Sequence, residues 1–266
     1  MTKRITFVIN TCNEENNIKD CLESISWADE IIIVDAYSTD HTIKIARDFT
    51  NNIHYSKSTG YVETSRNFGI SKAKSKWIFI LDADERLPPE AKNILFNLIK
   101  IKNTNGFYIP RRNYISTNNY LKYGYFYPDW QLRLFKNYYK NRYSGIIHQQ
   151  IKIFPRNIVK CSKFEIIHNY SRSKYSSFFS IKRLIPYILI ESKDLLNKNV
   201  SIIELFSDAV LNLPRHFVRS FIYLNGYRDG YDGFRAAIIF GVYQSLIYYY
   251  AVYLIIKKRI YYSNNL

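Results

Sequence analysis

The stretch WIFILDADERLPPE, residues 77–90, begins as an apolar run and ends in a group of carboxylates. Asp82 and Asp84 stand two residues apart at the end of that run, and side chains two apart on a strand point to the same side. Carboxylates this close repel one another, so we expect a cation beside them. Mg²⁺ and Mn²⁺ prefer oxygen ligands and commonly keep substrate phosphates in their coordination shells. The pair therefore predicts a divalent metal site that a diphosphate completes, although an isolated DxD is more often a solvated turn before a helix.

The segments around this pair predict an α/β fold with a mostly parallel sheet. Short apolar runs alternate with segments that have a helical pattern, which is the order of βαβ units. The run 31–34 consists of aliphatic residues only, which is typical of a strand buried on both faces. The predicted strands are residues 5–10, 31–34, 52–57, 77–81, 106–115 and 131–137. The predicted helices are residues 18–25, 41–49, 63–75 and 88–101.

Polar residues follow three of the predicted strands directly, at 11–14, 35–40 and 82–85. In open α/β sheets, ligands bind beyond the carboxyl ends of the strands, so we expect these three segments to border one crevice. The sequence contains neither GxGxxG nor a Walker A motif, which excludes the usual dinucleotide and P-loop fingerprints.

Three motifs occur in a characteristic order: NTCNEENN, EIIIVDAYSTDHT and ETSRNFGISKAKSKWIFILDADE. Together they resemble the family-2 glycosyltransferases of the GT-A fold. The later YPDWQLRLFKN, YSGIIHQQI and LPRHFVRSFIYLNGYRDGYDGFRAAIIF resemble the bacterial lipopolysaccharide-core β-1,4-glucosyltransferase group. The resemblance implies a Rossmann-like mixed sheet flanked by helices, built for nucleotide-diphospho-sugar transfer. It also implies an inverting transferase that uses a nucleotide sugar and a divalent metal.

The resemblance implies donor contacts from residues that lie near the ends of the first, second and fourth strands. They are Thr11, Asn13 and Glu14 beside the nucleotide, Asp35 on the uracil, Arg66 and Asn67 near the phosphates, Asp82 near the ribose and Asp84 as the main metal ligand. Glu85 either serves this site or caps the following helix.

The segment YPDWQLRLF holds the catalytic candidate, Asp129, which stands where the family places its base. Inverting transfer needs a carboxylate that takes the proton of the acceptor hydroxyl as its oxygen attacks the anomeric carbon. Trp130 is expected in the acceptor wall, and Arg133 is expected to pair with Asp129 or touch phosphate. His148 and His168 each follow a short apolar strand and are candidates for a third metal ligand or a diphosphate contact. The alternatives are a capping aspartate beside a core tryptophan, and structural histidines.

The composition favours an anionic partner. The 266 residues carry a formal net charge of +16, with 25 tyrosines and 17 phenylalanines, and 47% of the chain is hydrophobic. Basic and aromatic residues together suit a membrane interface or single-stranded nucleic acid, and composition alone does not choose between them. The three cysteines form no CxxC pair, which indicates free thiols in a reducing cytosol. The start MTKRITFVIN is too short in its apolar run for a signal peptide.

Near residue 170 the alternation of strands and turns ends, and long aromatic and aliphatic stretches with basic clusters follow. We therefore predict a transferase domain at 1–170 and a helical, basic-aromatic, membrane-associating region at 171–266. Residues 236–256 carry no charge, are followed by KKR, and are long enough to cross a bilayer. Gln244 and the nearby tyrosines prefer an interface, and LPRHFVRSFIYL resembles an interfacial helix. Lying on the membrane, spanning it and packing as a soluble arm all remain open.

These observations lead to one hypothesis and three alternatives. The enzyme is expected to move a hexose, from UDP-glucose, to a lipopolysaccharide inner-core sugar or a related lipid-linked glycan. It would work at the cytoplasmic face of the bacterial inner membrane, on an anionic surface, with no nucleic-acid partner. The first alternative is the same fold acting on a polyprenyl-linked or protein acceptor. The others are a catalytically decayed protein that binds membrane or nucleic acid, and a sugar nucleotidyltransferase, for which TCNEENN lacks the glycine-rich basic loop.

Overall fold

The structure is a computed structural model, and it describes residues 4–57, 63–116, 119–138, 142–143, 151–153, 157–169, 181–198 and 200–263. The chain divides into two compact units. The first combines Met1–Tyr120 with Pro128–Arg172, and the second combines Leu121–Tyr127 with Ser173–Leu266. The sequence did not predict that the short segment Leu121–Tyr127 leaves the first unit and folds with the C-terminal helices.

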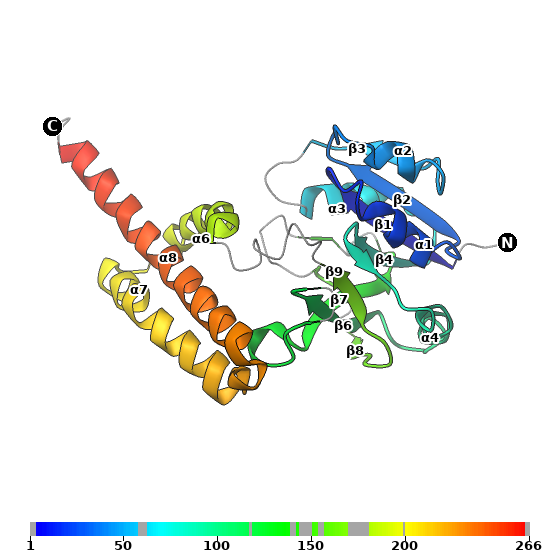
Figure 1. The fold of residues 1–266 in the computed structure, drawn as a ribbon. Helices are drawn as coiled ribbons and strands as arrows, with labels where there is room; N and C mark the ends of the chain where they lie inside the picture. Colours follow the sequence, from blue (N-terminus) through cyan, green and yellow to red (C-terminus); the bar gives the residue numbers. More distant parts are fainter. Residues whose placement is uncertain are drawn as a thin grey trace. The chain divides into compact units, whose positions relative to one another are not determined.

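Parallel strands form one half of the sheet in the first unit (Figure 1). They are β3 (Ile53–Tyr55), β2 (Glu30–Asp35), β1 (Ile5–Thr11) and β4 (Trp77–Asp82), in that spatial order. The register pairs Thr11 with Asp35 and Asn10 with Asp82. The carboxyl ends of these strands therefore lie at nearly the same level, and the polar residues after them are brought to one edge.

The other half of the sheet is mixed and begins where β4 pairs antiparallel with β7. The strands are β7 (Asp129–Lys136), β6 (Gly106–Tyr114), β9 (Ile166–Asn169) and β5 (Glu85–Arg86), with β8 (Ile158–Lys160) also pairing with β6. Within the described residues the sheet has nine strands. β5 and β8 were not predicted, because these short strands form by pairing with β9 and β6, which are distant from them in sequence.

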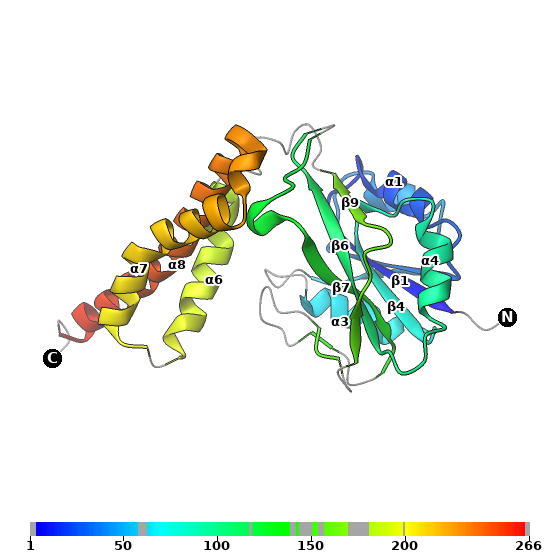
Figure 2. The same cartoon turned by 90° about the horizontal axis from the view of Figure 1, so that it is seen from below.

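Helices cover both faces of the sheet (Figure 2). One face packs against α1 (Ile18–Ser24), α2 (Thr42–Ala46) and α4 (Ala91–Leu98), and the other against α3 (Glu63–Lys72). Successive strand residues point to opposite faces, so Phe7 belongs to the first layer and Val8 to the second. Because both faces are buried, the parallel strands are continuously apolar, and this is why the sequence predicted them correctly.

The second unit is helical. Its elements are η1 (Gly124–Phe126), η3 (Ile181–Leu184), α6 (Ile185–Leu196), α7 (Ile202–Phe217), the π-helix η4 (Val218–Tyr223), η5 (Gly226–Asp229) and α8 (Gly230–Ser263). α7 and α8 lie side by side in both views, and Leu205 packs against Ala251 and Val252 (Figures 1 and 2). Among the described residues, Gly226–Lys258 is long and apolar enough to cross a membrane by length and composition.

The predicted α/β architecture, a mixed sheet flanked by helices with an apolar helical C-terminal region, is confirmed. All the predicted strands and helices of the first unit are present, with ends that shift by a few residues. The three cysteines are free thiols, as predicted; Cys12 is exposed and the other two are buried.

Candidate active site

Hydrogen bonds join the loops after β1 and β2, two of the segments that were predicted to border one crevice. The backbone N–H of Asn13 donates to the Ser38 hydroxyl at 2.9 Å, and the Asn13 side-chain oxygen accepts the backbone N–H of Thr39 at 2.8 Å. The backbone N–H of Glu14 donates to the Thr42 hydroxyl at 2.8 Å. Asn13 has a φ of 54°, in the left-handed region, and such strained backbone is frequent at functional sites.

Asp35 lies at the end of β2 and is fully buried. Its carboxylate accepts the hydroxyl of Ser38 at 2.5 Å and the backbone N–H of the same residue at 2.8 Å. Beside it in the sheet, the hydroxyl of Thr11 is buried and has no hydrogen-bond partner within the described part of the chain. An unsatisfied buried hydroxyl costs free energy, so a ligand that bonds to it would gain stability there.

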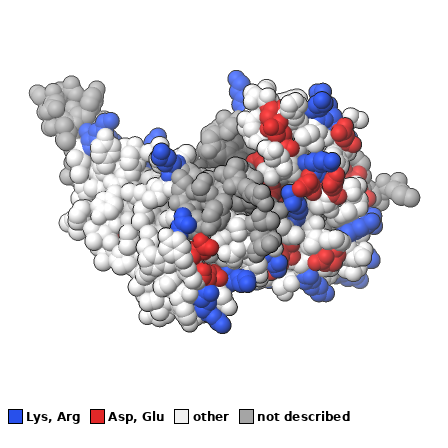
Figure 3. Space-filling view, in the orientation of Figure 1, with Lys and Arg blue, Asp and Glu red and all other residues white. Residues whose placement is uncertain are grey.

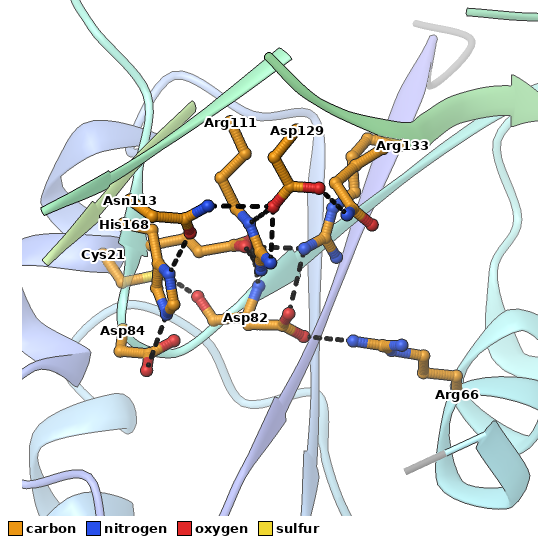
Figure 4. A network of polar contacts seen from close by, with 11 residues as sticks. Cys21, Arg66, Asp82, Asp84, Arg111, Asn113, Asp129, Arg133 and His168 are labelled. Carbon is orange, nitrogen blue, oxygen red and sulfur yellow. Dashed lines mark hydrogen bonds and ion pairs between the residues drawn. The ribbon is translucent and has the colours of Figure 1, made fainter. Parts of the chain in front are cut away.

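Asp82 ends β4 between two arginines (Figure 4). One oxygen accepts Arg66 Nη2 at 2.6 Å, and the other accepts Arg133 Nη2 at 3.0 Å. Burial by itself raises the pKa of Asp82, but the charges of Arg66 and Arg133 outweigh it and hold the pKa well below its usual range. Of the two roles expected for Arg133, pairing with Asp129 is not found among the described residues, since Arg133 pairs with Asp82 and Glu85. Contact with phosphate stays a prediction.

Asn67, predicted near the phosphates, makes a reciprocal pair with the backbone of Tyr143. Its Nδ2 donates to the carbonyl oxygen at 2.9 Å, and its Oδ1 accepts the backbone N–H at 2.8 Å. The side chain of Asn67 therefore fastens residues 142–143 to α3 in this structure.

Glu85 is fully buried at the centre of the ion pairs. Its carboxylate accepts Arg111 Nη1 at 2.9 Å, Arg133 Nη2 at 2.6 Å and the backbone N–H of Asp82 at 3.0 Å. The residue that precedes α4 in the cap position is Glu90, so Glu85 does not cap that helix. Of the two roles considered for Glu85, the structure places it within the site network.

Asp129, the predicted base, is surrounded by hydrogen-bond donors (Figure 4). Arg111 reaches Oδ2 through Nε at 2.9 Å and Nη2 at 2.8 Å, and Asn113 Nδ2 reaches the same oxygen at 3.0 Å. Oδ1 accepts Gln131 Nε2 at 2.6 Å. Burial raises the pKa of Asp129, but the Arg111 charge and these hydrogen bonds outweigh it, so the net pKa is lowered. The neighbouring Trp130 has Lys160 Nζ 5.0 Å from its ring centroid.

His168 lies between Asn113 and Asp84 (Figure 4). Its Nδ1 is 2.8 Å from Asn113 Oδ1, and its Nε2 is 3.3 Å from Asp84 Oδ2. The Nδ2 of Asn113 faces the Asp129 carboxylate, which can only accept, so Oδ1 of Asn113 must face the histidine. Nδ1 of His168 therefore carries the proton and donates it. Its Nε2 faces a carboxylate, an arrangement that needs either a second proton or a cation between the two groups.

Among the described residues, no group of three His, Cys, Asp or Glu side chains is placed to hold a metal ion. Asp84 and His168 are a pair of one oxygen and one nitrogen donor, 3.3 Å apart. Nitrogen and oxygen donors of this kind fit Mn²⁺ or Mg²⁺ when phosphate and water complete the shell. His148, the predicted third ligand, lies outside the described residues.

Sheet pairing explains why residues so far apart in sequence meet. Asn113 pairs with His168 across β6 and β9, and His168 pairs with Glu85 across β9 and β5. Arg111 pairs with Asp129 across β6 and β7. Sequence reasoning missed Arg111, Asn113 and Gln131. The available signal was a spacing of two residues on a strand, both between Arg111 and Asn113 and between Asp129 and Gln131. Side chains with this spacing point to the same face of the sheet, and Arg111 pairs with Asp129, so all four share one face.

The sequence and the fold of this chain both resemble those of known proteins. The family model described as "Glycosyl transferase family 2" matches residues 6–164, more than half of the chain. The chain is 31% identical over 171 residues to the SPbeta prophage-derived glycosyltransferase SunS of Bacillus subtilis, covering 63% of this chain and 38% of SunS. It is 30% identical over 119 residues to the lipopolysaccharide core biosynthesis glycosyltransferase LpsC of Rhizobium meliloti, covering 42% of each. The chain thus spans less than half the length of these relatives.

Among solved structures, S. aureus TarS 1-349 in complex with UDP-GlcNAc has a TM-score of 0.50 at 15% identity, covering 93% of this chain and 91% of that one. At this identity the likeness concerns the fold alone. Together with the family match, it confirms the GT-A fold.

Proposed function

The chain belongs to glycosyl transferase family 2. On that premise we propose that it is a nucleotide-sugar glycosyltransferase that transfers a hexose with inversion, from UDP-glucose to a lipopolysaccharide inner-core sugar or a related lipid-linked glycan. The single observation that carries the catalytic part is the position of Asp129, an ionised carboxylate held by four donor contacts on the same sheet edge as Asp82 and Asp84.

The donor diphosphate is expected beside the arginines around Asp82. Nε of Arg66 and Nε of Arg133 are buried and have no hydrogen-bond partner in the part of the chain that the structure describes. Phosphate oxygens are acceptors that pair well with guanidinium groups. The loops with Thr11, Asn13, Glu14 and Asp35 would then bind the nucleoside, with the buried hydroxyl of Thr11 as one of the donors. TarS, which shares the fold, was crystallised with UDP-GlcNAc, and this supports a uridine nucleotide.

Asp84 and His168 are the residues that we propose as protein ligands of Mg²⁺ or Mn²⁺. Asn113 holds the histidine in the tautomer whose Nε2 faces Asp84, so a lone pair is available for the ion. A metal bound there would supply positive charge beside the leaving diphosphate, an effect worth several kcal/mol in general. Asp82, which both arginines contact, would contribute through the ribose or through water.

Asp129 would act as the base. The acceptor hydroxyl oxygen forms a bond to the anomeric carbon while the bond from that carbon to the diphosphate oxygen breaks. The electron pair of the broken bond leaves on the diphosphate, and the hydroxyl proton passes to Asp129. Oδ2 already accepts hydrogen bonds from Arg111 Nε and Asn113 Nδ2 and makes an ion pair with Arg111 Nη2. Oδ1 accepts one hydrogen bond, from Gln131, so Oδ1 is the oxygen with room for the proton. Proton transfer of this kind contributes about 10²–10⁴ in rate.

The acceptor and the location are proposed from charge and from kinship. A net charge of +16 favours an anionic surface, and the apolar helix α8 adds a segment compatible with the membrane. LpsC is named for lipopolysaccharide core biosynthesis, which supports an acceptor of that class. We propose the cytoplasmic face of the inner membrane as the location. A polyprenyl-linked or protein acceptor would use the same donor site.

A calorimetric titration tests the donor site. Detergent-purified protein is titrated with UDP, UDP-glucose and GDP-mannose, each with and without Mn²⁺. We expect binding of UDP and UDP-glucose that is stronger with Mn²⁺, and weak binding of GDP-mannose. Tighter binding of GDP-mannose than of UDP-glucose would show that the proposed donor is wrong. Equal binding with and without Mn²⁺ would show that the donor site does not use the metal. A panel of lipopolysaccharide-core, polyprenyl-linked and peptide acceptors with the accepted donor then separates the acceptor classes.

A further inference from the structure

The helix α7 has apolar side chains on two of its faces. The face that packs against the rest of the second unit carries Leu205, Ala209 and Asn212, all buried. A second, adjoining face carries larger apolar side chains in solvent. We call this face the α7 stripe; it consists of Ile203, Phe206, Val210 and Leu213, which are 79%, 55%, 48% and 39% exposed. The surface helix of a water-soluble protein normally has one apolar face, turned inward, and polar residues elsewhere, so the second apolar face is the unusual feature.

The α7 stripe is continuous along the helix. Its members are spaced three, four and three residues apart, so at 3.6 residues per turn they lie on one line. A helix of 16 residues is about 24 Å long, so the stripe is an extended surface and not a single exposed side chain. The helix itself is well formed, because Ser201 and Glu204 make a capping box at its start. The outward apolar face is therefore a property of a stable helix.

Basic and aromatic side chains border the stripe at its C-terminal end. Arg215 and Arg219 are exposed, and the Arg215 side chain keeps 56% of its surface in solvent while it contacts Asp208. The tyrosines that follow are also exposed: Tyr223 by 76%, Tyr227 by 52% and Tyr231 by 72%. In Figure 3 the side of the second unit that faces the reader is mostly free of charged side chains. Arginine and tyrosine at the rim of an apolar face are the residue types of a membrane interface.

We propose that α7 lies in the surface of an anionic bilayer, with the α7 stripe among the acyl chains and with Arg215 and Arg219 at the level of the lipid phosphates. Charge selects this occupant, since a chain with a net charge of +16 is attracted to an anionic surface and repels a second copy of itself. The exposed tyrosines fit the headgroup region, where an aromatic ring and a hydroxyl are both accommodated. The inference deepens the proposed function, because it gives a soluble sugar donor and a lipid-linked acceptor a common surface.

The test uses the full-length protein in sedimentation with vesicles of phosphatidylcholine alone or mixed with phosphatidylglycerol. We expect binding to the mixed vesicles that weakens with added salt. The double variant Ile203→Gln with Phe206→Gln should lose at least about tenfold in partition coefficient, because two large side chains no longer leave water. Arg219→Gln should lose about fivefold on the mixed vesicles. Ile101→Gln, which changes an isoleucine 47% exposed in the first unit, is the matched control and should bind as the wild type does.

Two further measurements keep the outcomes apart. Circular dichroism must show the same helix content in the double variant, and glutamine is chosen because it is a good helix former. UDP binding by the double variant should be unchanged, so a loss of vesicle binding is separate from a failure of the proposed donor site. Equal vesicle binding by the double variant and the wild type would overturn the inference. So would a concentration-dependent dimer that the double variant abolishes, because the stripe would then be covered by a second copy.

Discussion

Arg111 contacts a single oxygen of Asp129 twice, through a hydrogen bond from Nε at 2.9 Å and an ion pair from Nη2 at 2.8 Å. The same guanidinium donates through Nη1 to the buried Glu85 at 2.9 Å. Arg111 therefore connects the proposed base to the ion pairs around Asp82. The Arg111 charge and the hydrogen bonds to Asp129 outweigh its burial, so the pKa of this carboxyl is lowered.

The pH dependence of transfer should report this contact. The net pKa of Asp129 is lowered, so its ionised form persists below about pH 4, the ordinary range of an aspartate. Removing the arginine charge in Arg111→Gln leaves burial, which raises the pKa. The acid limb of kcat should therefore move to higher pH in this variant. The profile is measured at saturating donor.

Arg112→Gln is the control for that profile, because Arg112 pairs with Glu165 and makes no contact with Asp129 among the described residues. Its acid limb should coincide with that of the wild type. An unshifted limb in Arg111→Gln would mean that the pH dependence belongs to another group.

The proposed metal pair predicts a loss of Mn²⁺ affinity. Asp84→Asn removes the charged oxygen that faces His168, so Mn²⁺ binding in the presence of UDP should weaken by more than the roughly 10–100-fold typical of outer-shell partners. Calorimetry or the electron paramagnetic resonance of free Mn²⁺ measures it. Asp20→Asn, which changes a carboxylate paired with Arg86, should leave the affinity as it is. Equal affinities in the two variants would contradict the assignment.

Asn113 should act on the metal without touching it. Asn113→Leu removes the acceptor that fixes the His168 tautomer, so Mn²⁺ affinity should fall by about 10–100-fold. Gln131→Leu is the informative comparison, because Gln131 contacts Asp129 and is not bonded to His168. It should lower kcat and leave Mn²⁺ affinity unchanged. If both variants bind Mn²⁺ as the wild type does, the hydrogen bond from His168 has no role in metal binding.

The packing of α3 on the sheet gives a prediction about stability. A Cβ at Gly69 would lie 2.4 Å from Val8 Cγ1 and 2.9 Å from Val34 Cγ2. Gly69→Ala should therefore destabilise the first unit by about 1–3 kcal/mol, the usual cost of overpacking, despite the better helix propensity of alanine. Urea unfolding measures the free energy. Ser71→Ala, on the exposed side of the same helix, should change it by no more than about 0.5 kcal/mol. A Gly69→Ala protein as stable as the wild type would show that α3 can move away.

The sequence predicted the elements whose signal is local. Residues 31–34 and 77–81 are continuous apolar runs, and such runs form buried strands wherever they pair. β5 is only two residues long, and its position depends on pairing with β9 about eighty residues later, so no local pattern could reveal it.

The same distinction applies to the site. Asp82, Asp84 and Asp129 stand in recognisable motifs, and the structure brings them to one edge of the sheet. Arg111 and Asn113 join them only through the register between β6 and its neighbours, which is a non-local property. His168 approaches Asp84 through the pairing of β9, and nothing in the short apolar run before this histidine indicates that contact.

Acceptor-dependent release of UDP by the wild type and by Asp129→Asn, at saturating UDP-glucose and Mn²⁺, tests whether Asp129 is the base. We expect the variant to bind UDP as tightly as the wild type and to release it about 10²–10⁴ times more slowly in the presence of acceptor. Release at the wild-type rate by a variant with unchanged donor binding would contradict the assignment of Asp129 as the base.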